Sequence, residues 1–146
     1  MIANATGREC TPVIVYLDTN CVVCLVESNP AWLPQVVARM GAARSAGDTF
    51  AVSDLTRAEA LVVPYRKADA AAEAAFDAFF GLTDMTVFPV TRAVCERSAR
   101  LRAAHRFLKL PDAMHLVAAI EHGCGLFLTA DARLAAVTGI AVEAVR

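Results

Sequence analysis

Four acidic residues lie far apart in this chain, and each follows a predicted strand or begins a predicted helix. They are Asp18, Glu59, Asp112 and Asp131. If the strands are parallel neighbours, the four carboxylates can meet at one edge of the sheet, outside the carboxyl ends of the strands. Carboxylates at close range repel one another unless a cation lies between them. The pattern therefore predicts a divalent metal site, and ligands of this kind suit Mg²⁺ or Mn²⁺.

Each acid also has an ordinary structural interpretation. Asp18 could simply begin a helix, Glu59 could form a partly buried ion pair, and Asp112 could be a first-turn charge. Asp131 could form a plain turn and cap together with Thr129. The coincidence of all four at strand ends or helix starts carries the prediction of a site.

Two further motifs contain residues that could do chemistry. Cys21 and Cys24 form a C-x-x-C, but no second pair follows, and the valines between them predict a buried helix face. The total of five cysteines is odd, which argues against a disulfide framework. His115 lies on an apolar helix without a second His at metalloprotease spacing, so we predict a packed, hydrogen-bonded core residue.

The elements that must position these residues are short apolar runs alternating with longer helical ones. Strands are expected at residues 13–17, 50–52, 85–89 and 126–129, with an edge strand at 140–145. Helices are expected at residues 21–28, 33–45, 53–63, 68–80, 91–106 and 111–122, with a short helical segment at 131–137. Thr19 or Asn20 is expected to cap the first helix, and Pro64 to stop or kink the third. The alternation predicts an α/β fold with a mainly parallel sheet.

Length and composition bound the classes of protein to consider. At 146 residues we expect one domain, at 13–146, behind a flexible leader at 1–12. No apolar stretch reaches the roughly 18–20 residues of a membrane span, and the N-terminus lacks the pattern of a secretory signal, so a cytoplasmic protein is expected. The net charge of −1 argues against a uniformly basic nucleic-acid binder, although removing the four acids leaves +3.

Four segments of the chain occur in a recognisable order, namely 16–20 (YLDTN), 53–59 (SDLTRAE), 110–119 (LPDAMHLVAA) and 128–131 (LTAD). As an ordered set they resemble the motifs of PIN-domain ribonucleases, and in particular of the VapC-type toxins of bacterial toxin–antitoxin pairs. The resemblance covers most of the chain from Val13 onward. It implies a three-layer α/β/α fold with a central, mainly parallel sheet.

The resemblance also implies an activity, a site and partners. The activity is metal-dependent endoribonuclease cleavage of RNA, and the partners are an antitoxin protein that blocks the site and a second copy of the chain in a homodimer. The number of Mg²⁺ or Mn²⁺ ions, one or two, is left open because only Asp131 is acidic in the last motif. No residue is assigned to RNA binding. The implied metal site consists of Asp18, Glu59, Asp112 and Asp131, with Asn20 and Thr129 as supporting polar groups.

Two other functions compete with a nuclease. A phosphatase or receiver domain would use Asp18 as phosphoacceptor, but it needs a Lys at the end of a late strand, and Lys67 and Lys109 lie in helical or loop segments. A PIN-like module that binds RNA or protein without cutting is the main alternative. The presence of all four acids argues against that alternative.

Overall fold

The computed structural model describes residues 2–3 and 9–145. Within the leader expected at 1–12, residues 1 and 4–8 lie outside the described residues. Ile2–Ala3 (β1) and Glu9–Cys10 (β2) pair antiparallel. The flexibility of the leader and the domain boundary at residue 13 therefore stay predictions.

The centre of the molecule is a five-stranded sheet in which every neighbouring pair is parallel. Its order is β5-β4-β3-β6-β7. The expected edge strand is thus present as β7, beside β6. The strands are β3 (Ile14–Leu17), β4 (Thr49–Ser53), β5 (Met85–Phe88), β6 (Leu126–Thr129) and β7 (Val142–Ala144).

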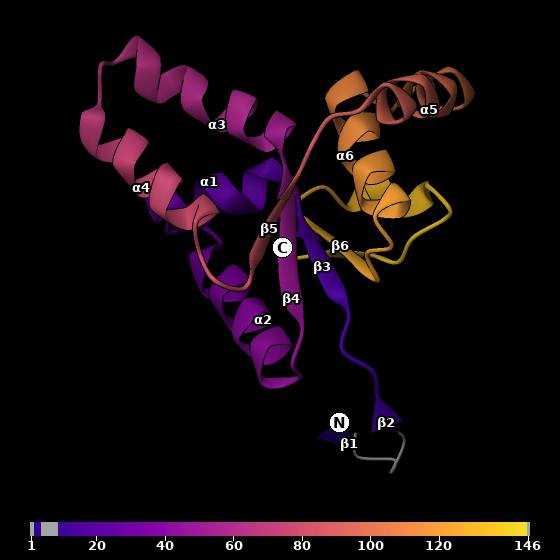
Figure 1. Cartoon of the computed structure of the whole chain (residues 1–146), viewed down its shortest axis with the longest axis horizontal. Coiled ribbons are helices and arrows are strands. Elements are labelled where there is room, and N and C mark those ends of the chain that lie inside the picture. Colours follow the sequence, from indigo (N-terminus) through magenta and orange to yellow (C-terminus); the bar gives the residue numbers. More distant parts are fainter. Residues whose placement is uncertain (1, 4–8, 146) are drawn as a thin grey trace.

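Helices cover both faces of this sheet, so the predicted three-layer α/β/α fold is confirmed. Helices α1 to α4 lie on one side and α5 and α6 on the other (Figure 1). In the part of the chain that the structure describes, no helix combines the length and apolar character needed to cross a bilayer. The helices are α1 (Thr19–Glu27), α2 (Leu33–Ser45), α3 (Asp54–Arg66), α4 (Ala70–Phe80), α5 (Arg92–Ala104), α6 (Leu110–Glu121) and the short 3₁₀ helix η1 (Ala132–Ala136).

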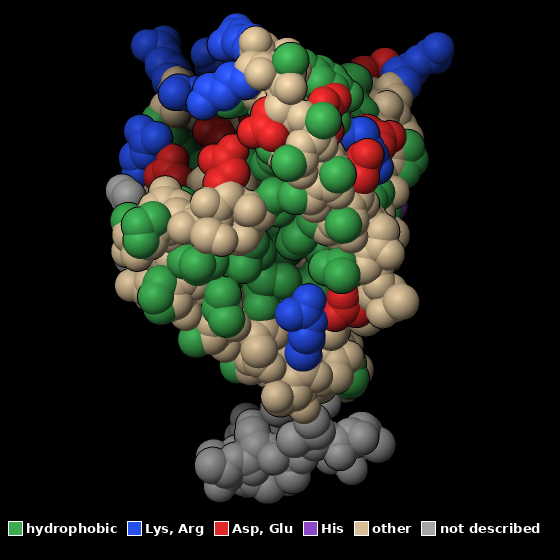
Figure 2. Space-filling view, turned by 90° about the vertical axis from the view of Figure 1, so that its left-hand side faces the viewer, with side chains coloured by type: hydrophobic (Ala, Val, Ile, Leu, Met, Phe, Trp, Pro, Cys, Tyr) green, Lys and Arg blue, Asp and Glu red, His purple; other side chains and the backbone are tan. Residues whose placement is uncertain are grey.

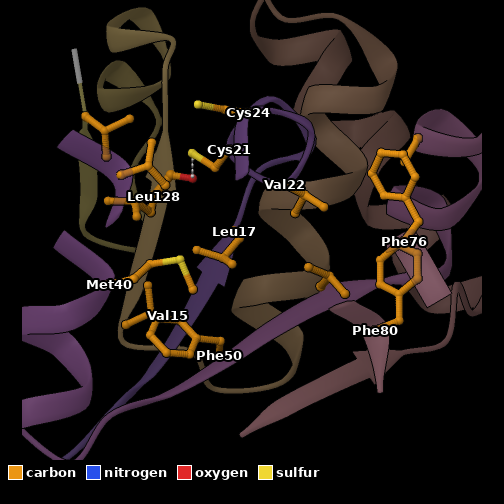
Figure 3. Close-up of a cluster of buried hydrophobic side chains, with 14 of the residues drawn as sticks. Val15, Leu17, Cys21, Val22, Cys24, Met40, Phe50, Phe76, Phe80 and Leu128 are labelled. Carbon is orange, nitrogen blue, oxygen red and sulfur yellow. Dashed lines mark hydrogen bonds between the residues drawn. The ribbon is translucent and has the colours of Figure 1, made fainter. Parts of the chain in front are cut away.

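The sheet separates two hydrophobic cores, because successive side chains of a strand point to opposite faces. In β3, Val15 and Leu17 belong to the core under α1 to α4, where they pack with Phe50 (Figure 3). Tyr16 points the other way and stacks on Phe127 with ring centroids 5.4 Å apart. A strand buried on both faces must be apolar throughout, which explains why the sequence of β3 shows no alternation.

The C-x-x-C belongs to the first of these cores. Cys21 and Cys24 are 0% and 1% exposed and face the sheet from α1. The Cys21 thiol donates a hydrogen bond to the carbonyl of Leu128 at 3.6 Å (Figure 3). Burial raises the pKa of both thiols, which keeps them protonated. The prediction of core packing is confirmed.

The structure differs from two local predictions. Pro64 was expected to stop or kink helix α3, and it does not stop it: the helix continues to Arg66, where the Lys67 N–H closes the last turn on the Val63 carbonyl at 3.1 Å. Pro64 removes one helical hydrogen bond, but it is buried in the fold, and tertiary packing holds the final turn. The cap of α1 is Asp18 rather than Thr19 or Asn20, since the helix begins at Thr19, two residues earlier than expected.

Candidate active site at the carboxyl edge of the sheet

The strand order creates a switch point at β3. From β3 the chain proceeds to β4 on one side, while β6 occupies the other side, so the connections leave in opposite directions. Open parallel sheets bind ligands at such a point, outside the carboxyl ends of the strands. Asp18 follows β3 here, and its N–H donates to the Leu128 carbonyl of β6 at 2.9 Å. The sheet thus places Asp18 where a ligand site is expected.

Asp18 is a buried carboxylate, only 4% exposed. Its oxygens accept hydrogen bonds from the Thr19 N–H at 2.9 Å, the Thr129 hydroxyl at 2.7 Å and the Asn20 amide at 3.2 Å. Burial nevertheless raises the pKa of Asp18, and the charge of Glu59 raises it further, against the opposing effects of His115, Thr129 and Thr19. The ionised form therefore lacks compensation that a bound cation could supply.

Asn20 and Thr129 connect Asp18 to the end of β6. The Asn20 side-chain carbonyl accepts the N–H of Ala130 at 3.2 Å. The Thr129 hydroxyl donates to Asp18 and accepts the N–H of Asp131 at 3.0 Å. Both residues thus lie where supporting groups were expected. They fix the orientation of the Asp18 carboxylate relative to Asp131.

Glu59 lies at the rim of the site on α3, with its side chain 34% exposed. It accepts hydrogen bonds from the Thr19 hydroxyl at 2.8 Å and from His115 Nε2 at 2.5 Å. Burial raises the pKa of Glu59, but the hydrogen bond and charge of His115 and the hydrogen bond of Thr19 outweigh it and hold the pKa below its ordinary value. The structure therefore shows Glu59 hydrogen-bonded to His115 and Thr19 at the rim of the site.

His115 is buried and hydrogen-bonded, as predicted, but its bonds also orient Glu59. Because a carboxylate can only accept, Nε2 must carry a hydrogen in its bond to Glu59. On the other side of the ring, Nδ1 lies 2.7 Å from the Tyr16 hydroxyl, which in turn donates to the Ser53 hydroxyl at 2.9 Å. Burial raises the pKa of Tyr16, so its hydroxyl stays protonated. The hydrogen-bonded chain that links Ser53, Tyr16, His115 and Glu59 was missed from the sequence.

Asp112 and Asp131 complete the acidic group. Asp112 lies in the first turn of α6, and its pKa is raised by burial and by the charges of Asp18, Asp131 and Glu59. Asp131 caps η1 and accepts two hydrogen bonds from the Arg133 guanidinium, at 3.0 Å from Nε and 2.8 Å from Nη2. The four acids predicted from the sequence therefore occupy one edge of the sheet and influence one another electrostatically.

Comparison with known proteins identifies this architecture. The family model described as PIN domain matches residues 15–140. The chain belongs to the PIN domain family. A comparison with curated protein sequences gives no match.

Solved structures of toxin–antitoxin proteins have the same fold as this PIN domain. VapBC2 from Rickettsia felis, bound to a DNA fragment from its promoter, superposes with a TM-score of 0.69 at 16% identity, covering 90% of this chain and 98% of the other. A toxin–antitoxin complex from Klebsiella pneumoniae gives 0.66 at 21% identity, covering 90% and 98%. VapC20 from Mycobacterium tuberculosis, a toxin that cleaves the sarcin–ricin loop, gives 0.64 at 19% identity, covering 77% and 86%.

The acids of the PIN domain site do not form a closed set of metal ligands. Among residues 2–3 and 9–145, no three or more His, Cys, Asp and Glu side chains form a group that could hold a metal in the present arrangement. In this arrangement Glu59 is hydrogen-bonded to His115 and Asp131 to Arg133. Their side chains are 34% and 26% exposed, so neither acid is buried in the core.

The chemistry of the acids does fit a hard divalent cation. All ligand atoms offered by the four acids are carboxylate oxygens, which suit Mg²⁺ and Mn²⁺. Burial raises the pKa of Asp112, and the charges of Asp18, Asp131 and Glu59 raise it further against the opposing charge of His115, so a bound cation would favour the ionised carboxylate. The assignment of these residues as metal ligands stays a prediction.

Proposed function

We propose that this PIN domain is a Mg²⁺- or Mn²⁺-dependent endoribonuclease and the toxin of a toxin–antitoxin pair. One observation carries the nuclease proposal, namely the buried carboxylate of Asp18 at the switch point of the sheet, beside three further acids. Family membership and the fold shared with toxin–antitoxin structures support the same conclusion. The proposal includes a homodimer and a cytoplasmic location.

Each residue of the acidic site would have a separate role in phosphodiester hydrolysis. Asp18 would be the central ligand, with Asp112 and Asp131 beside it, and a bound Mg²⁺ or Mn²⁺ would supply an activated water and neutralise charge on the phosphate. Glu59 would join the ligands or orient the attacking water through its free carboxylate oxygen. Asn20 and Thr129 would hold Asp18 in place, because their hydrogen bonds fix both the strand end and the carboxylate.

The proposal predicts RNA cleavage that depends on a divalent metal. Purified protein incubated with structured RNAs should cut them in the presence of Mg²⁺ or Mn²⁺, and excess EDTA should stop the reaction. Gel analysis of end-labelled RNA measures both rate and position. Absence of cleavage with either metal and every RNA, while a small protein partner still binds, would favour the alternative of a binding module.

The contacts of His115 predict a role in orienting Glu59. His115→Leu still fills the buried position but removes the donor to Glu59, and we expect RNA cleavage to fall about 10- to 100-fold, as for other residues that orient a metal ligand. His115→Gln retains an N–H that can reach Glu59, so it should recover much of that loss. Cleavage rates and urea unfolding of both variants provide the measurement. Equal activity of His115→Leu and the natural chain would contradict the role.

A hydrophobic groove on the face covered by α1, α2 and α4 supports an antitoxin partner. Its volume is about 370 Å³, and Figure 2 shows hydrophobic side chains filling a hollow across the middle of this face. Arg44 lies at its edge and pairs with Asp84 at 2.8 Å. Asp and Glu side chains lie above the hollow in the same view, mixed with Lys and Arg side chains. The groove is lined mainly by Leu25, Val26, Val37, Met40, Phe79 and Leu82.

The groove predicts which substitution releases the antitoxin. Val37 is 52% exposed and lines the groove, so Val37→Asp places a charge among apolar side chains without opening the core. We expect it to weaken antitoxin binding by at least about tenfold, since burying an unpaired charge is costly. Co-expression with the cognate antitoxin, followed by pull-down, measures the loss. RNA cleavage by the free Val37→Asp protein should be unchanged, because Val37 lies outside the acidic site.

A further inference from the structure

Beside the acidic site lies a hollow that the proposed chemistry does not use. Its volume of about 760 Å³ falls within the range of ligand sites, which is about 300–1,000 Å³. It shares Asn20 and Asp131 with the acidic site, so a group bound in the hollow lies next to the reacting phosphate. The hollow is lined by Asn20, Trp32, Ala130, Asp131, Ala132 and Arg133.

Trp32 forms the apolar wall of this hollow. It is partly buried against the core under α1 to α4 and immediately precedes α2. The loop before it is held by Asn29, whose side chain accepts the Ala31 N–H at 3.0 Å and whose carbonyl accepts the Leu33 N–H at 3.1 Å. Among the described residues, no other ring and no guanidinium stacks on the indole. An indole that lines a hollow and carries no other ring offers a surface on which a planar ligand can stack.

Arg133 forms the cationic wall. Its side chain is 67% exposed, and its Nε and Nη2 bind two oxygens of Asp131 in a forked geometry that also matches a phosphate. This fork becomes available to a phosphate when Asp131 turns toward the metal, as the proposed function requires. The amide of Asn20 is engaged on both sides, by Asp18 and by the Ala130 N–H. The hollow therefore offers stacking and a phosphate donor, but Asn20 contributes little hydrogen bonding to the edge of a base.

We propose that this hollow binds one unpaired nucleotide of the RNA, next to the scissile bond, with its base stacked on Trp32 and its phosphate on Arg133. The inference rests on the proposed function as a ribonuclease. A base inside a duplex is covered by neighbouring base pairs on both faces, so only a single-stranded base can reach the indole. Because stacking tolerates every base, the subsite selects single-stranded RNA more strongly than it selects a sequence.

The fluorescence of Trp32 provides a direct test, because it is the only Trp in the chain. In EDTA and at low salt, where RNA is not cut, a short single-stranded RNA should change the emission of Trp32 on binding. A duplex of the same length should have a much smaller effect. RNA that binds by anisotropy of an attached dye, yet leaves the Trp32 emission unchanged, overturns the proposal.

Variants give the second arm of the test, with RNA affinity measured by dye anisotropy. Trp32→Ala should weaken binding about 5- to 150-fold, the range for loss of one stacked base. Trp32→Phe keeps an aromatic ring and should recover most of the affinity, which separates stacking from a folding defect that thermal melting would also reveal. Arg133→Gln should weaken binding and flatten its salt dependence, because one phosphate contact is lost.

The matched control is Tyr65→Ala, which removes an aromatic side chain that is 62% exposed on α3, outside the hollow. It should leave RNA affinity unchanged, and a loss equal to that of Trp32→Ala would count against the subsite. RNA cleavage in Mg²⁺ is measured in parallel. If the protein cleaves RNA in the presence of metal but Trp32→Ala does not change RNA affinity, the proposed ribonuclease activity is supported and only the subsite is refuted. Failure to cleave or bind any RNA refutes both.

Discussion

Asp18→Asn should reduce RNA cleavage by more than about 100-fold, which exceeds the usual effect of losing an outer-shell partner of a metal. The substitution removes one negative charge and almost no volume. The Thr19 N–H and the Thr129 hydroxyl can still bond the Asn side chain, since a hydroxyl both donates and accepts. The fold should therefore persist while the central ligand is lost. Initial rates of RNA cleavage at several Mg²⁺ concentrations measure the effect.

The control for this experiment is Asp77→Asn. Asp77 lies on α4 with its side chain 70% exposed and forms only a surface pair with Arg57 at 3.4 Å. Because surface pairs contribute little, this variant should keep both its stability and its cleavage rate. Metal-dependent cleavage that survives Asp18→Asn would falsify the assignment of Asp18 as the central ligand.

Mn²⁺ should raise the midpoint of thermal unfolding of the natural chain by several degrees. A ligand that binds only the folded state at 100 times its dissociation constant stabilises it by about 2.7 kcal/mol. For a domain of this size, about 1 kcal/mol corresponds to roughly 2–4 °C. In Asp112→Asn the shift should be much smaller, because one acid and its charge are missing from the site. Calorimetry with and without Mn²⁺ measures both shifts, and an equal shift in the two proteins would remove Asp112 from the ligand set.

In the metal-free protein, the buried Asp18 carboxyl group should make stability fall as the pH rises. The folded-state pKa of Asp18 is raised above its ordinary value, mainly by burial, so the folded state holds this proton more tightly than the unfolded chain. The stabilisation that comes from this tighter proton binding is complete below about pH 4, the pKa of Asp in the unfolded chain. It is lost as the pH rises through the higher pKa of Asp18 in the folded protein. Asp18→Asn removes this loss. Without metal at neutral pH, we expect the variant to melt at least about 2 °C above the natural chain.

Much of the fold could be predicted from the sequence because its signals are local. Helix α2 and strand β6 lie at the predicted residues, since apolar runs and Gly or Pro punctuation specify where an element begins and ends. Pro64 shows the limit of such signals. Its effect on a helix depends on whether packing compensates for the lost hydrogen bond, and packing is not visible in a local pattern.

The sequence by itself determined the element types, the α/β class and the four acids at strand ends and helix starts. It also indicated that Cys21 and Cys24 belong to the core. These features depend on residue type and on spacing within one element, which a linear pattern contains.

Only the tertiary structure decided which side chains meet. His115 contacts Tyr16 and Glu59 across 99 and 56 positions of the chain, and Trp32 shares a hollow with Asp131. Contacts of this kind depend on strand order and on the angle at which helices cross the sheet. Those quantities arise from packing of the whole chain, so no single segment encodes them.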